Sequence, residues 1–383
     1  MARAPAIATL EDEQLPEPDK LEGFPSPRHT GRLYGHAAAE QEFLSAYDTG
    51  RLHHAWIVAG PAGIGKATLC YRFARFLLAA DSERDMFGSS LDIDPSTASS
   101  HLVASLAHPE LLVLRRPYDF KTKKLKTEIT VDEVRRLRGF LGLSAGEGWR
   151  VVIVDPVDDL NSNAANALLK SIEEPPPRTA FLLVCSEPER LLPTIRSRCR
   201  TLSCGGLVPE DLHKAVAQAL NAADDTSTHT SLPSGEEWQT LVQLSQGSVR
   251  RLLMLHTAKG LELHRKIMMA VAALPNIDWL PLHALGDELA SPVAEPKYEL
   301  FFELFLANVA RMIRAAATGE GQPSDLELAG RLIPADRLAA WAQLWETTVA
   351  EKISTETYNL DRKSLILLSF QRLVEISRGA GPA

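Results

Sequence analysis

The chain has 383 residues, and its 41 Lys and Arg against 49 Asp and Glu give a formal net charge of −8 at pH 7. Hydrophobic residues make up 45% and charged residues 23%, which excludes a mostly disordered chain and a small disulfide scaffold and indicates two or three globular domains. The acidic balance also argues against a protein that coats nucleic acid through bulk positive charge.

Residues 1–28 are acidic and interrupted by prolines, which predicts a flexible tail rather than a signal peptide. No window approaches the roughly 18 uninterrupted apolar residues of a membrane span, so we expect a cytoplasmic protein. The four cysteines form no C-x-x-C pair, and we therefore expect reduced thiols and no zinc site. These cysteines are Cys70, Cys185, Cys199 and Cys204.

Residues 29–205 alternate between apolar strands and amphipathic helices. Strands are expected at 55–60, 110–114, 150–155 and 180–185, and helices at 36–47, from Lys66, from about Thr130 and at 161–174. Strands that are apolar nearly throughout are typical of a parallel sheet covered on both faces. The fold class is therefore α/β, while the Ser- and Asp-rich residues 81–108 are expected to form a long loop or an insertion.

After about residue 205 the strand pattern stops. Residues 206–260 are expected to form a small helical domain, and residues 261–383 a second, all-helical one. Apolar residues recur on one face of 298–313 and of 360–376, which predicts helices packed against helices.

Gly60-Pro61-Ala62-Gly63-Ile64-Gly65-Lys66 matches G-x-x-x-x-G-K between a predicted strand and a predicted helix, which is the phosphate-loop context. Gly60, Gly63 and Gly65 would let backbone N–H groups turn toward phosphate oxygens, and Lys66 would add a positive charge. The next residue, whose hydroxyl usually ligates Mg²⁺, is Ala67. Thr68 follows, but one residue along a helix turns the side chain by about 100°. The Thr68 hydroxyl is therefore a poor replacement for the hydroxyl that Ala67 lacks.

Asp155 ends an apolar strand and could hold Mg²⁺ directly or through water. In many ATPases a Glu follows and polarises the attacking water, whereas here Pro156 follows. The loss of two catalytic parts predicts very slow hydrolysis. Two alternatives stay open. The loop binds ATP or ADP weakly, or it is kept only as an element of the fold.

Three sequence blocks resemble the clamp-loader branch of the AAA+ proteins, and within it the delta-prime subunits of bacterial DNA polymerase III in their alphaproteobacterial form. They are NALLKSIEEPPP (166–177), SEPERLLPTIRSRCR (186–200) and GSVRRLL (247–253). The resemblance covers roughly residues 30–260. It implies a P-loop NTPase-like AAA+ domain over 29–205, a lid over 206–260 and a helical collar over 261–383 that oligomerises.

The family's role, implied by the resemblance, is to help load the sliding clamp onto primed DNA in replication. The implied partners are the ATPase subunits and delta, with the clamp and DNA reached through the assembly. Arg198, within Ser197-Arg198-Cys199, would complete a neighbouring subunit's ATP site as an arginine finger, unless it only pairs with a local carboxylate. Ser186 falls near the sensor 1 position and could equally be a turn residue. Arg250 falls on the sensor 2 position and could equally form an interdomain salt bridge.

The sequence departs from the family at residues 81–108, which hold no cysteine where many relatives carry a four-cysteine zinc module. A metal-free insertion is therefore expected there. The basic run at 115–126 could touch DNA phosphates, although a solvated hairpin is the favoured interpretation. Two competing functions are an ATP-hydrolysing loader subunit, opposed by Ala67 and Pro156, and a degenerate AAA+ scaffold outside replication, opposed by Arg198.

Overall fold

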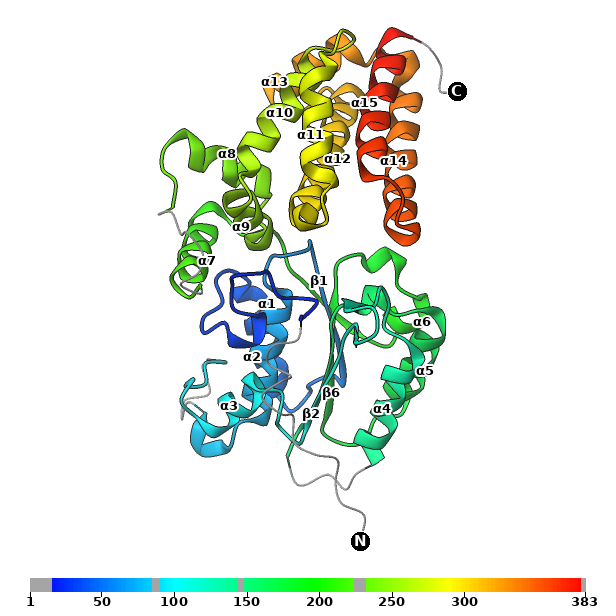
Figure 1. Cartoon of the computed structure of the whole chain (residues 1–383). Helices are drawn as coiled ribbons and strands as arrows, with labels where there is room; N and C mark the ends of the chain where they lie inside the picture. The colour runs from blue at the N-terminus through cyan, green and yellow to red at the C-terminus, as the bar shows by residue number, and fades with distance from the viewer. Residues whose placement is uncertain (1–15, 85–89, 143–147, 224–231, 380–383) are drawn as a thin grey trace. The chain divides into compact units, whose positions relative to one another are not determined.

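The computed structural model describes residues 16–84, 90–142, 148–223 and 232–379 (Figure 1). The chain divides into two compact units, with the division between Leu253 and Met254. Within the described residues, no helix is long and apolar enough to cross a membrane.

The first unit is built on a five-stranded parallel sheet with the strand order β2-β5-β6-β1-β7. The strands are β1 (Ala55–Ala59), β2 (Leu111–Leu114), β5 (Arg150–Val154), β6 (Thr179–Cys185) and β7 (Arg200–Ser203). β1, β5 and β6 are buried along their whole length, as their apolar runs predict. β7 was not expected from the sequence, because it is an edge strand in which only Leu202 is buried.

Helices cover both faces of this sheet (Figure 1). On one side lie α1 (Ala37–Asp48), α2 (Lys66–Leu78) and α3 (Ala98–Ala104), and on the other α4 (Val131–Gly142), α5 (Ser162–Glu173) and α6 (Pro193–Arg196). α7 (Pro209–Asn221), α8 (Glu236–Ser245) and α9 (Val249–Thr257) follow in the chain, and α9 crosses the division between the units. The α/β fold class expected for this part of the chain is confirmed.

Residues 16–28 differ from the expected flexible tail. Glu17 is buried, and its carboxylate lies 2.9 Å from Nη2 of Arg28 and 2.6 Å from Nη1 of Arg115. Phe24 is only 4% exposed. These contacts attach residues 16–28 to the α/β unit. Residues 1–15 of the predicted tail lie outside the described residues.

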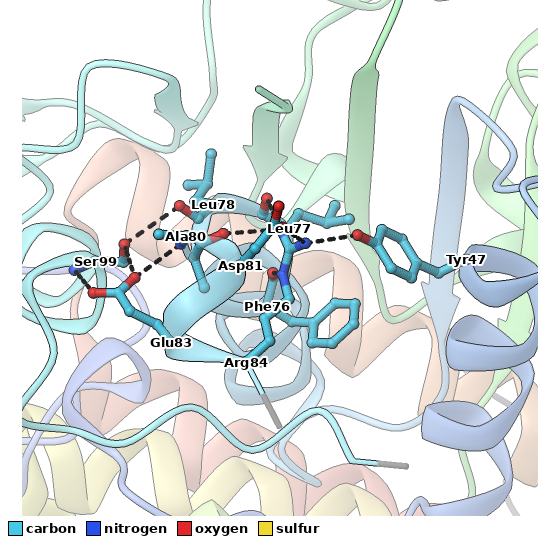
Figure 2. A network of polar contacts seen from close by, with 10 residues as sticks. Tyr47, Phe76, Leu77, Leu78, Ala80, Asp81, Glu83, Arg84 and Ser99 are labelled. Carbon is cyan, nitrogen blue, oxygen red and sulfur yellow. Dashed lines mark hydrogen bonds and ion pairs between the residues drawn. The ribbon is translucent and has the colours of Figure 1, made fainter. Parts of the chain in front are cut away.

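The start of the 81–108 insertion is held by a polar network at the carboxyl end of α2 (Figure 2). Arg84 donates through Nε to the carbonyl of Phe76 (3.0 Å) and through Nη2 to those of Leu77 (3.1 Å) and Ala79 (2.9 Å). Glu83 accepts a hydrogen bond from Ser99 Oγ at 2.6 Å. Arg84 thus holds the start of this insertion against α2, and Glu83 ties it to α3. Residues 85–89 lie outside the described part of the chain.

The 115–126 run forms a short antiparallel hairpin of β3 (Tyr118–Asp119) and β4 (Lys124–Leu125), so the hairpin prediction is confirmed. Arg115 pairs with Glu17, and Arg116 lies with its Nε 3.0 Å from Oδ2 of Asp159. The exposed basic groups are Lys121, Lys123, Lys124 and Lys126. Contact of this hairpin with DNA stays the alternative to the favoured solvated role.

The described residues of the second unit form helices around an apolar core. They are α10 (Gly260–Ala272), α11 (Trp279–Ala290), α12 (Glu295–Thr318), α13 (Pro323–Leu332), α14 (Leu338–Tyr358) and α15 (Arg362–Arg378). Phe301 and Phe305 on α12 pack against Phe370 on α15, with ring centroids 6.2 and 5.2 Å apart, respectively. The expected all-helical C-terminal region is confirmed, whereas the lid and collar boundary at 260/261 stays a prediction.

Candidate functional site

The phosphate loop joins β1 to α2, and close contacts with neighbouring segments require glycine at Gly60 and Gly63. Gly60 has φ +153°, and a Cβ there would lie 2.1 Å from the carbonyl oxygen of Cys204. Gly63 has φ +75°, and a Cβ there would lie 2.4 Å from Ser248 Oγ. Larger residues at either position would push the loop away from the segments that lie against it.

Lys66 is 4% exposed and binds inside its own loop. Its Nζ donates to the carbonyls of Gly60 (2.7 Å) and Pro61 (2.6 Å) and to Ser186 Oγ (3.1 Å). Burial lowers the pKa of the Lys66 ammonium, against the opposing charges of Asp158 and Asp155. The structure therefore brings Ser186, at the end of β6, to the cation that would meet a phosphate group.

Asp155 follows β5 directly and is 7% exposed. Burial, with the nearby Asp19 carboxylate adding to it, raises the pKa of Asp155 to about 8, although Lys66 and Arg115 oppose the shift. Asp158 is not a replacement for the missing Glu. Its carboxylate accepts hydrogen bonds from the backbone N–H groups of Ser186 (2.6 Å) and Glu187 (3.1 Å), so it fixes the end of β6.

A cavity of about 370 Å³ opens beside the loop. Small-molecule sites commonly measure about 300–1,000 Å³, so this volume suits a bound ligand. The predicted site residues that line it are Gly63, Gly65, Lys66, Ala67, Thr68, Asp155, Ser186 and Arg250. Gly60 is not among the lining residues, and it acts instead through its carbonyl, which holds Lys66.

Arg250 connects the start of α9 to this cavity. Its backbone N–H donates to the Gly63 carbonyl at 3.2 Å, and its Nη1 donates to the Asp19 carbonyl at 3.1 Å. His36 Nε2 lies 2.9 Å from the carbonyl oxygen of Ile64, within the loop itself. Sequence reasoning missed both Asp19 and His36, because they reach the site through contacts far apart in the chain and belong to no local motif.

The donors at the site do not fit the usual magnesium-binding pair of a phosphate-loop enzyme. Ala67 supplies no hydroxyl, and Thr68 is buried at 7% exposure on the next helical position. Asp155 is the remaining protein carboxylate of the expected pair, and Mg²⁺ usually needs near-ideal octahedral oxygen ligation. Among the described residues, no group of three or more His, Cys, Asp or Glu could hold a metal ion.

Arg198 lies just after α6 and does not line the described cavity of its own chain. Its side chain is 40% exposed, and its Nε lies 2.9 Å from Oε1 of Glu173, which is 39% exposed. Nη1 also donates to the Thr194 carbonyl at 3.0 Å and to Ser197 Oγ at 3.3 Å. Cys199 packs against the core, and burial raises the pKa of its thiol to about 12, so it anchors the motif rather than reacting.

Comparison with known proteins finds subunits of DNA polymerase III among the similar sequences. A family model described as "DNA polymerase III, delta subunit" matches residues 35–206. The DNA polymerase III subunit delta′ of Pseudomonas aeruginosa is 40% identical over 152 residues, which cover 39% of this chain and 43% of that protein. The subunit delta′ of Escherichia coli K12 is 30% identical over 254 residues, which cover 66% of this chain and 69% of that protein. The match thus spans less than half of the first relative's length.

Among solved structures, a DNA polymerase III gamma subunit-related protein of Thermotoga maritima is similar with a TM-score of 0.41 and 15% identity. That match covers 88% of this chain and 100% of the other.

Proposed function

The chain belongs to the DNA polymerase III subunit delta′ family, and from this premise we propose that it is a clamp-loader subunit that helps place a sliding clamp on primed DNA. Its direct partners are the ATPase and delta subunits of the loader. The clamp and DNA are reached through the assembled complex.

The chain's own nucleotide site is proposed to bind ATP or ADP weakly and to hydrolyse ATP inefficiently. Lys66 and Ser186 supply a cation and a hydroxyl at the loop, which supports phosphate binding. Ala67 and Pro156 remove the hydroxyl and the carboxylate on which hydrolysis depends, each worth orders of magnitude in rate. A bound phosphate would replace the loop carbonyls that now hold the Lys66 ammonium.

Arg198 is proposed to act on the nucleotide of a neighbouring subunit. The observation that carries this proposal is that Arg198 is exposed and separate from the cavity of its own chain. Its planar guanidinium stays charged and suits the oxygens of a phosphoryl group in transfer, where such arginines contribute about 10³–10⁵ in rate. The partner Glu173 is itself exposed, and such surface pairs contribute only about 0–1 kcal/mol, so the pair can open at low cost.

The test is the DNA- and clamp-stimulated ATPase rate of a loader reconstituted with this chain. Arg198→Ala should lower the rate tens-fold or more with assembly intact. Arg196→Ala is the matched control, because Arg196 is 45% exposed and pairs with Glu189 at 2.8 Å, and it should leave the rate unchanged. An unchanged rate in Arg198→Ala would make Arg198 structural and favour the scaffold alternative.

The pair with Glu173 offers a specific alternative, in which Arg198 only fixes the turn after α6 locally. Glu173→Gln separates the two roles, because it removes the local carboxylate and leaves the guanidinium in place. The arginine-finger proposal expects an ATPase rate within about twofold of wild type, since the finger itself remains. A local role that depends on Glu173 expects the rate to fall in Glu173→Gln as well, by less than in Arg198→Ala, because the bonds from Arg198 to Thr194 and Ser197 remain.

A further inference from the structure

A second cavity, of about 190 Å³, lies against α2, α3 and the short helix η2 (Pro27–His29). Its lining includes three arginines, Arg28, Arg72 and Arg75, together with His29 and His101. None of the described residues that line it is a carboxylate. We propose that this cavity is a binding site for a phosphate group.

Two of the three arginines are already neutralised by the protein. Arg28 lies 2.9 Å from a carboxylate oxygen of Glu17. Arg72 lies 2.7 Å from Glu40 and 2.8 Å from Asp92. Both side chains are less than 10% exposed, so they form a rigid wall of guanidinium groups whose charges are already paired, rather than mobile surface groups.

Arg75 differs from the other two. It is half-buried, and no carboxylate among the described residues lies within ion-pair distance of it. Burial and the neighbouring charge of Arg72 lower the pKa of Arg75, yet an arginine stays charged in a protein. Its Nη2 donates to the carbonyl of Arg28, which occupies one of its five N–H donors.

A partly desolvated cation without a counter-ion is unfavourable, and an anion in the cavity would supply both the missing charge and the missing acceptors. The fork of a guanidinium matches a phosphate group in a bidentate way. The cavity is smaller than the about 300–1,000 Å³ typical of sites for whole small molecules, which suits a single tetrahedral anion rather than a nucleoside. The group could come from free inorganic phosphate or from a phosphorylated DNA end.

The test is calorimetric titration of the full chain with inorganic phosphate at fixed ionic strength. Arg75→Gln should weaken binding at least tenfold. Lys66→Ala removes the cation of the phosphate loop and any phosphate binding there, so the binding that depends on Arg75 should remain with wild-type affinity in this variant. Arg135→Gln, which changes an exposed arginine on α4, should also bind as wild type. Equal affinity in Arg75→Gln and wild type, or loss of binding in Lys66→Ala, would overturn the proposal.

Arg75→Lys is the control for a folding defect in Arg75→Gln, because it keeps the positive charge and loses the planar guanidinium. This variant should bind phosphate with intermediate affinity. Wild-type affinity would contradict the bidentate contact.

A second titration compares one oligonucleotide with a 5′-phosphate or a 5′-hydroxyl end. Tighter binding of the 5′-phosphate form that is lost in Arg75→Gln assigns the site to a DNA end. Equal binding of both forms, with inorganic phosphate bound through Arg75, assigns it to the free anion.

Discussion

Glu17 holds two arginines with one buried carboxylate. Burial alone would raise its pKa, but the hydrogen bonds and charges of Arg28 and Arg115 outweigh burial and lower the pKa below its ordinary 4.5. A carboxyl whose pKa falls on folding stabilises the folded chain above its unfolded pKa. That contribution is lost as the pH falls through the folded value. The attachment of residues 16–28 is therefore acid-labile.

Glu17→Gln should lower the free energy of unfolding at pH 7 by about 3 kcal/mol, the scale for removing one partner of a buried pair. The gap to wild type should narrow as the pH falls from about 4.5, the ordinary value, through the lower pKa of the folded state, because the wild-type carboxyl is then protonated as well. Thermal or urea unfolding at pH 7, 5, 4 and 3 measures this gap. Glu22→Gln, at an exposed position in the same segment, is the control. An equal gap at pH 3 and pH 7 would rule out the charge as the cause.

At the level of single residues, the sequence allowed the phosphate loop to be predicted but not its surroundings. Gly63, Gly65 and Lys66 lie in one short motif whose spacing fixes their geometry. Asp19 and His36 reach the same loop across long stretches of chain. A proline-broken segment carries no periodicity that reports such contacts, so its burial could not be foreseen.

At the level of elements, the carboxyl end of α2 is held mainly by the side chain of Arg84, beside a hydrogen bond from Ser99 Oγ to the Leu78 carbonyl. The last carbonyls of a helix have no partners within the helix, and Arg84 binds those of Phe76, Leu77 and Ala79 around this end (Figure 2). The same guanidinium donates to Tyr47 Oη at 2.8 Å, which ties α1 to this point. Arg84 thus orders the start of an insertion that holds no cysteine.

Arg84→Ala should destabilise the chain by about 1–3 kcal/mol, because it leaves several partly buried carbonyls without donors. Urea unfolding followed by circular dichroism measures the change. Arg135→Ala should change stability by less than about 0.5 kcal/mol, since Arg135 and its partner Asp132 are both well exposed. A loss in Arg84→Ala no larger than in Arg135→Ala would show that water replaces the arginine at this helix end.

The elements that sequence reasoning found are those with a strong apolar signal. β1, β5 and β6 are buried throughout and read as continuous apolar runs. β7 and α3 were missed for a physical reason. β7 pairs on one side only, and α3 (Ala98–Ala104) is short and rich in serine, so neither has a periodic apolar pattern.

At the level of the whole molecule, the proposed function separates the chain's own site from the site that it completes. Lys66→Ala should leave the stimulated ATPase rate of the reconstituted loader within about twofold of wild type, because this chain's site contributes little hydrolysis. The rate is measured beside Arg198→Ala in the same preparation, with assembly checked by gel filtration. A strong loss from Lys66→Ala alone would show that the phosphate loop takes part in catalysis.

The α/β unit was predictable as a whole because its strands, phosphate loop and helix starts have local signals. The second unit was predictable only as helical. Its core pairs such as Phe305 and Phe370 are far apart in sequence, and helical periodicity does not say which helices meet.

The cavity at the phosphate loop and the arginine-lined cavity share a wall, since His29, Thr30 and Gly31 line both. A ligand that orders this wall by binding in one cavity lowers the entropic cost that a second ligand meets on binding in the other cavity. Thermodynamic linkage then requires reciprocity, so that phosphate tightens nucleotide binding by the same factor by which nucleotide tightens phosphate binding. In a subunit that hardly hydrolyses ATP, the time for which the nucleotide stays bound would then depend on the phosphate concentration.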